Sequence, residues 1–79
     1  MDRITNARRA EVTRYIGKKI SSRRNEISMD LTALAGSCGL TPAQLNKYES
    51  GISCVDAALL YDIAGVLGIG MAAFFDGLS

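Results

Sequence analysis

The polar side chains best placed to bind a ligand lie in the stretch GLTPAQLNKYESG, residues 39–51. They can hydrogen-bond through amide and ammonium groups: Gln44, Asn46 and Lys47. The same stretch carries the signals of helix ends. Thr41 is a good N-cap, Pro42 suits the first helical position, and Gly51 can take the left-handed conformation that ends a helix. We therefore expect a short helix that presents polar groups to a partner.

Catalytic chemistry finds little support in the residue types. The chain has no His to act as a base near neutral pH. Ser50 and Ser53 lie beside no evident general base, and Asp30 and Asp56 are explained as helix caps. Without His, two cysteines cannot complete a four-ligand zinc site: Cys38 and Cys54. We expect no enzymatic activity, no metal and no cofactor.

Length and composition indicate one small globular domain, residues 1–79, with 1–5 as a possible flexible arm. The chain has 79 residues, of which 48% are hydrophobic. No apolar run approaches the roughly 20 residues needed to span a bilayer, and charges occupy the N-terminus where a signal peptide needs an apolar stretch. We expect a cytoplasmic protein that does not contact membranes.

Charge is distributed unevenly along the chain. The net charge is only +1, but all Lys and Arg except Lys47 lie within residues 1–24. This asymmetry indicates an anionic partner for the basic end, and a solvated helix face explains it equally well.

Helical periodicity accounts for the whole chain. The only Pro is Pro42, no stretch alternates with the period of a strand, and Val12, Ile16 and Ile20 form an apolar stripe with helical spacing. We expect an all-α fold of five short helices, at residues 6–24, 31–38, 42–50, 57–67 and 71–76.

Residues 30–50 have the spacing of a helix-turn-helix. Ala35 is small enough for the next helix to cross closely, Gly39 permits a left-handed turn, and Leu45 can anchor the second helix in the core. In this motif the second helix enters the major groove of DNA. Base edges are therefore a candidate ligand for the stretch 39–51.

The sequence from Ile16 to Phe75 resembles the phage-repressor-type helix-turn-helix family, the Cro/C1 or xenobiotic-response-element group. The matching stretches are IGKKISSRR, LTALAGSCGLTPAQLNKYESG and LYDIAGVLGIGMAAFF. YESG and VLGIGMAAFF resemble the family features E-N-G and A-L-G-V-x-x-x-x-L-F. The resemblance implies a compact, five-helix, lambda-repressor-like DNA-binding domain.

The resemblance also implies roles for individual residues. Base contacts fall at the start of the third helix and about one turn later: Thr41, Ala43, Gln44 and Lys47, with Pro42 between them offering no donor. Gln44 can pair with adenine and Lys47 can donate to guanine. Arg24 and Glu49 match a pair that bridges the first and third helices and braces the reading helix.

Contacts to the DNA backbone are less clearly encoded. Candidates are Asn46, Ser50, Ser53, Arg14, Lys18 and Lys19, together with the backbone N–H groups of residues 50–53. Leu31 departs from the family pattern, because many members have there a Gln that holds a phosphate. The loop ISCVD after Gly51 also lacks basic residues.

These features predict a sequence-specific, repressor-like transcriptional regulator that binds double-stranded DNA as a homodimer. The dimer interface is expected near the C-terminus: Met71, Phe74 and Leu78. The alternative is a protein-interaction module, or an antitoxin-like protein that binds a partner, keeping the fold with weak or no DNA recognition. Pro42, Ala43, Leu31 and the acidic C-terminal half favour this alternative.

Overall fold

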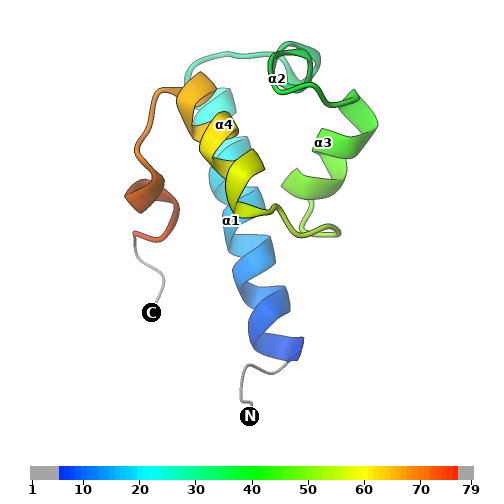
Figure 1. Ribbon diagram of the computed structural model, residues 1–79, viewed down its shortest axis with the longest axis vertical. Helices are drawn as coiled ribbons and strands as arrows, with labels where there is room; N and C mark the ends of the chain where they lie inside the picture. The colour runs from blue at the N-terminus through cyan, green and yellow to red at the C-terminus, as the bar shows by residue number, and fades with distance from the viewer. Residues whose placement is uncertain (1–5, 77–79) are drawn as a thin grey trace.

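Helix α1 (Asn6–Glu26) is the longest element of the computed structural model, which describes residues 6–76. It is followed by α2 (Leu31–Ser37), α3 (Pro42–Glu49), α4 (Ala57–Leu67) and a 3-10 helix, η1 (Met71–Phe74). Figure 1 shows α2 and α3 on one side of α1, η1 on the other, and α4 crossing in front. No strand occurs in residues 6–76, which confirms the all-α expectation.

The fifth helix is not the α-helix expected over residues 71–76. Its hydrogen bonds join residues three apart, from Ala73 N to Gly70 O and from Phe75 N to Ala72 O, each 3.0 Å. Such a short element, held by one fully buried side chain, Phe74, adopts the tighter 3-10 geometry that short helical pieces often take. The other helix ends differ slightly from expectation: α1 continues to Glu26, and α2 and α3 end at Ser37 and Glu49.

The core lies where α1 and α4 cross and is closed by α2, α3 and η1. One or more side chains from every element are fully buried there: Ile20, Leu34, Leu45, Ile63, Leu67 and Phe74. Polar contacts fix the C-terminal elements on α1. The Arg23 Nε donates to the Leu67 carbonyl at 3.0 Å, and the Tyr15 hydroxyl donates to the carbonyl of Asp76.

Helices α1 and α3 approach each other closely at Gly17. A Cβ added to Gly17 would lie 2.3 Å from the Tyr48 carbonyl oxygen and 2.8 Å from that of Glu49. Both are backbone atoms, so no rotamer change could make room. Glycine is therefore required where the C-terminal end of α3 rests on α1, a contact between residues far apart in the chain.

None of the helices in residues 6–76 has the length and apolar content to cross a bilayer. The same part of the chain contains no group of three or more His, Cys, Asp or Glu side chains that could hold a metal ion.

Candidate nucleic-acid interface

The turn between α2 and α3 sets how α3 is presented. Leu40 N donates to Ala35 O at 2.8 Å, and Gly39 has a left-handed φ of +72°. Ala35 and Leu45 are both fully buried. The structure thus confirms the positions that the helix-turn-helix spacing predicted for these three residues. It also confirms Thr41 as the N-cap of α3 and Pro42 as its first residue.

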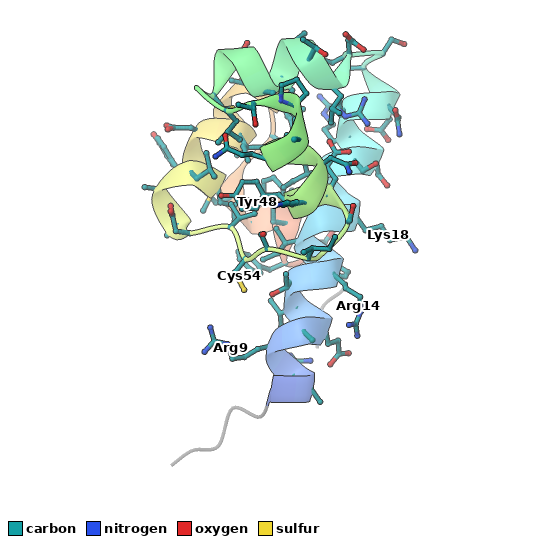
Figure 2. The ribbon with its side chains drawn as sticks, turned by 90° about the vertical axis from the view of Figure 1, so that its right-hand side faces the viewer. Arg9, Arg14, Lys18, Tyr48 and Cys54 are labelled. Carbon is teal, nitrogen blue, oxygen red and sulfur yellow. The ribbon has the colours of Figure 1, made fainter. Side chains whose placement is uncertain are left out.

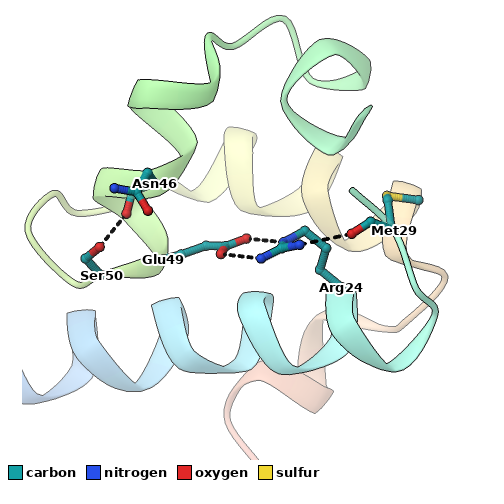
Figure 3. Close-up of polar contacts among 5 residues, drawn as sticks. All are labelled: Arg24, Met29, Asn46, Glu49 and Ser50. Atoms are coloured by element: carbon teal, nitrogen blue, oxygen red, sulfur yellow. Dashed lines mark hydrogen bonds and ion pairs between the residues drawn. The ribbon is translucent and has the colours of Figure 1, made fainter. Parts of the chain in front are cut away.

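A bidentate ion pair braces the C-terminal end of α3 from behind. Arg24 Nε lies 2.7 Å from Glu49 Oε2, and Arg24 Nη2 lies 3.1 Å from Glu49 Oε1. Arg24 Nη1 also donates to the Met29 carbonyl at 3.0 Å (Figure 3). The two side chains are only 15% and 8% exposed, so solvent screens the pair weakly. Hydrogen bonding to Glu49 raises the pKa of Arg24 above its usual value, although burial opposes the shift.

This pair is the one that the family resemblance implied. It joins α1 to α3 next to the close approach at Gly17, so α3 is held by packing and by charge at the same end. An ion pair in such a place fixes the orientation of a helix and leaves the opposite side of that helix available to a ligand.

The opposite side of α3 is exposed to solvent. We call its five exposed residues the outer face of α3: Pro42, Ala43, Gln44, Asn46 and Lys47. The Lys47 ammonium has no hydrogen bond or ion pair with any other residue in the range 6–76. Such a cation is available to phosphate or to acceptor atoms on base edges.

Gln44 is less free than the sequence expectation assumed. Its backbone N–H donates to Thr41 Oγ1 at 3.1 Å, and its Oε1 accepts from the Thr41 backbone N–H at 2.9 Å. The two residues form a capping box, which satisfies N–H groups at the start of the helix. The sequence signal for this cap is T-x-x-Q ahead of an apolar residue, and the expectation of Gln44 as a base contact alone does not include it.

The loop after α3 does not offer the free backbone N–H groups expected at residues 50–53. Ser50 N donates to Asn46 O and Gly51 N to Tyr48 O, while Ile52 N and Ser53 N both donate to Lys47 O, all within 2.9–3.2 Å. That expectation was wrong, because the end of α3 uses these groups to satisfy its own last carbonyls.

Ser50 keeps no donor for a phosphate in this conformation, since its hydroxyl donates to the Asn46 carbonyl at 2.6 Å (Figure 3). The Ser53 hydroxyl and the Asn46 amide have no side-chain hydrogen bond to another described residue. Ser53 is half-buried and Asn46 is exposed.

The cations of α1 fall on two different sides. Figure 2 shows Arg14 and Lys18 projecting from α1 on one side, and both line a groove between α1 and the C-terminal end of α3. Lys19 instead lies with its ammonium 5.6 Å from the centre of the Tyr15 ring and lines a hollow beside Ile69, on the η1 side. Lys19 thus extends toward η1, while it shares a second hollow on α1 with Lys18, from which it points about 100° away around the helix.

The three residues expected at a dimer interface differ in how the structure places them. Phe74 is fully buried within one chain, so its assignment to a dimer interface is wrong: the short η1 needs this ring to fill the core. Met71 is half-buried against the core, and the neighbouring Phe75 is 44% exposed. Leu78 and the arm at residues 1–5 lie outside the described residues.

Comparison with known families places this geometry among helix-turn-helix proteins. The model of the family described as "Helix-turn-helix" matches residues 20–74, which run from within α1 to the end of η1. The match includes the turn, α3, and both partners of the Arg24–Glu49 pair.

Two similar relatives are transcriptional regulators by name. The chain is 34% identical over 67 residues to an uncharacterized transcriptional regulator in the ATPase CF(0) region of Rhodospirillum rubrum, covering 85% of the chain and 62% of the relative. It is 34% identical over 62 residues to an uncharacterized HTH-type transcriptional regulator of Sinorhizobium medicae (strain WSM419), covering 78% of the chain and 45% of the relative. The chain thus spans about half the length of such curated relatives.

Among solved structures, the chain is similar to the clp gene regulator ClgR from Corynebacterium glutamicum. The TM-score is 0.80 at 25% sequence identity, over 82% of this chain and 69% of that one.

Proposed function

Because the chain belongs to the helix-turn-helix family of transcriptional regulators, of Cro/C1 type, we propose that it binds double-stranded DNA sequence-specifically and acts as a repressor-like regulator. The observation that carries the proposal is the contrast within α3. Its inner side is fixed to α1 by a bidentate ion pair, while its outer face is exposed and includes Lys47, whose ammonium has no partner among residues 6–76. A helix held in this way suits insertion into the major groove.

Within this proposal, the outer face of α3 reads base edges. Lys47 donates to base acceptors, Ala43 and Pro42 offer apolar contact to a thymine methyl, and the Thr41–Gln44 cap approaches the bases at the N-terminal end of the helix. Each good base contact contributes roughly 1–3 kcal/mol of discrimination. So few contacts give limited specificity from one chain.

Arg14 and Lys18 are the proposed phosphate contacts, because they project beside the C-terminal end of α3 and have no partner among the described residues. Asn46 and Ser53 add neutral donors nearby. Phosphate contacts position a protein on DNA and contribute affinity that does not depend on sequence.

A homodimer completes the proposal, because two copies double the number of base contacts. Two-fold symmetric pairs of this motif place their reading helices roughly 34–36 Å apart, one turn of DNA. Met71 and Phe75 are the apolar side chains near the end of the described chain that a partner copy can cover.

The proposal is tested by selecting bound sequences from random duplex DNA, followed by a salt titration on the selected duplex. Log affinity should fall linearly with log salt, with a slope of about −0.9 per phosphate contacted. A palindromic selected site indicates a dimer. Failure to select any sequence, together with no binding to duplex at low salt, contradicts the proposal.

Two matched substitutions separate the roles on the selected duplex. Lys47→Ala should relax the preference at one base pair, whereas Arg14→Ala should weaken binding to all duplexes alike and reduce the salt slope by about 1. Exchange of these two outcomes would show that the assignment of α3 as the reading helix is wrong.

A second candidate is a protein-interaction module with little DNA recognition. The observation that favours it is that the backbone N–H groups of residues 50–53 are all used within the chain, while Pro42 and Ala43 carry no donor. The low-salt binding measurement distinguishes it, since a module of this kind binds duplex weakly or not at all and selects no sequence.

A further inference from the structure

The amide of Gln44 has a fixed orientation at the N-terminal end of α3. Its Oε1 accepts hydrogen bonds from the backbone N–H of Thr41 at 2.9 Å and from the Thr41 hydroxyl at 3.3 Å. A backbone N–H can only donate, so the atom facing it must be the amide oxygen and not the nitrogen. The orientation therefore follows from the hydrogen-bond chemistry.

Both acceptor sites of the Gln44 oxygen are occupied in this arrangement. An amide oxygen has two lone pairs, and the Thr41 N–H and O–H use both. What Gln44 still offers is its NH₂ group, with two donors. This group makes no hydrogen bond with another described residue.

Adenine recognition by glutamine needs the atoms that Gln44 has already used. The bidentate pair requires the amide oxygen to accept from the adenine N6 amino group while the NH₂ donates to N7. To make that pair, Gln44 must break the capping box that starts α3. Guanine can be bound with the capping box intact, because its major-groove edge presents two acceptors, N7 and O6, to the NH₂ group of Gln44.

Lys47 has the same chemistry one turn further along. Its ammonium carries three donors and no acceptor, and residues three apart are neighbours on a helix surface. Both long polar side chains at these positions of the outer face thus present donors only.

Building on the proposed function, we infer that Gln44 reads DNA as a donor-only side chain, so that Gln44 and Lys47 together select guanine rather than adenine. The capping box is the device that sets this choice, since it turns the acceptor of Gln44 back toward the chain. Thr41 is then a positioning residue for base readout.

The inference is tested on the duplex selected by the wild-type chain, with two substitutions of Gln44. Gln44→Glu keeps an oxygen for the Thr41 N–H but replaces the donors by an acceptor, and Gln44→Met removes both groups at similar length. The base pair whose identity the Met variant no longer distinguishes is the one that Gln44 contacts. Tyr61→Ala, at an exposed position of α4 outside the outer face of α3, serves as the control with unchanged preference.

At that base pair, the wild type should prefer guanine by roughly 5- to 150-fold, the range expected for one good base contact. Replacing this guanine by 7-deazaguanine, which lacks the N7 acceptor, should weaken wild-type binding and leave the Met variant unaffected. Gln44→Glu should move the preference toward cytosine, whose N4 amino group donates.

Selection of adenine at that pair, with affinity lost when adenine is replaced by an analogue lacking the 6-amino group, overturns the inference and leaves the proposed function standing. Full retention of base preference by the Met variant also overturns it. If the wild type selects no sequence and binds no duplex, the proposed function itself fails, and the inference fails with it.

Discussion

The two sides of α3 are built in opposite ways. On the inner side, Leu45 is fully buried, Glu49 is paired with Arg24, and the last carbonyls rest on Gly17. On the outer face, the side-chain hydrogen bonds found within residues 6–76 are those of the Thr41–Gln44 cap and the bond from the Ser50 hydroxyl to the Asn46 carbonyl. The residues that hold α3 on α1 are thus different from the residues that α3 leaves available to a ligand. Substitutions on the two sides should therefore change different measurements.

The largest expected effect is on the inner side, at Gly17. In Gly17→Ala the new Cβ meets two backbone oxygens, so α3 must move away from α1 and the packing around Leu45 loosens. We expect the free energy of unfolding to fall by about 3 kcal/mol, measured by urea denaturation.

Gly65→Ala is the matched control, because an added Cβ there meets nothing within 4 Å. This variant should gain roughly 0.5–1 kcal/mol from the better helix propensity of alanine. Equal effects of the two substitutions would contradict the close approach of α1 and α3.

The next largest effect on stability is expected at the Arg24–Glu49 ion pair. Glu49→Gln leaves the largely buried Arg24 guanidinium without its carboxylate, and we expect a loss of about 2 kcal/mol in the same measurement. Glu26→Gln is the control, since its carboxylate is 69% exposed where it meets Arg23 and its loss should cost under about 0.5 kcal/mol. Similar losses in both variants would mean that the Arg24–Glu49 pair does not fix α3.

Gln44 belongs to the outer face but also stabilises the start of α3 through the capping box, so its variants separate the two roles. Gln44→Ala removes half of the capping box and should cost about 1 kcal/mol, a shift of roughly 4–8 °C in Tm. Gln44→Glu keeps the cap and places a negative charge at a helix N-terminus, so its Tm should match or exceed that of the wild type. A Tm equally lowered in both variants speaks against the box.

The smallest effect on stability is expected on the outer face. Lys47→Ala removes a side chain without a partner in residues 6–76, so the free energy of unfolding should change by less than about 0.5 kcal/mol. Thermal unfolding measures this directly. A large loss would place Lys47 among the residues that hold the fold, and so remove the distinction between the two sides.

Local signals in the sequence predicted most of the fold. Thr41, Pro42 and Gly39 specify the turn and the start of α3 through backbone chemistry that acts over a few residues, and each takes the predicted position. Asp56 caps α4 as expected, accepting from Leu59 N at 2.8 Å. Asp30 lies at the N-cap of α2 but makes no side-chain cap hydrogen bond.

Features that depend on long-range contacts were beyond the sequence. The role of Gly17 depends on where the C-terminal end of α3 packs against α1. The position of Lys19 beside η1 depends on the path of the chain after α4. The Arg24–Glu49 pair joins distant residues too, and it was predicted only because the family resemblance supplied both partners. Residue types alone could not predict that the backbone N–H groups of residues 50–53 donate to the last carbonyls of α3.

We propose that the outer face of α3 is the surface that meets DNA. Titrating the ¹⁵N-labelled chain with the selected duplex and following backbone amide chemical shifts tests it most directly. We expect the largest changes at Ala43, Gln44 and Lys47, smaller ones near Arg14 and Lys18, and little change at η1 or at the exposed Tyr61 of α4. Large changes at Tyr61 or η1 with α3 unaffected would show that a different surface meets DNA.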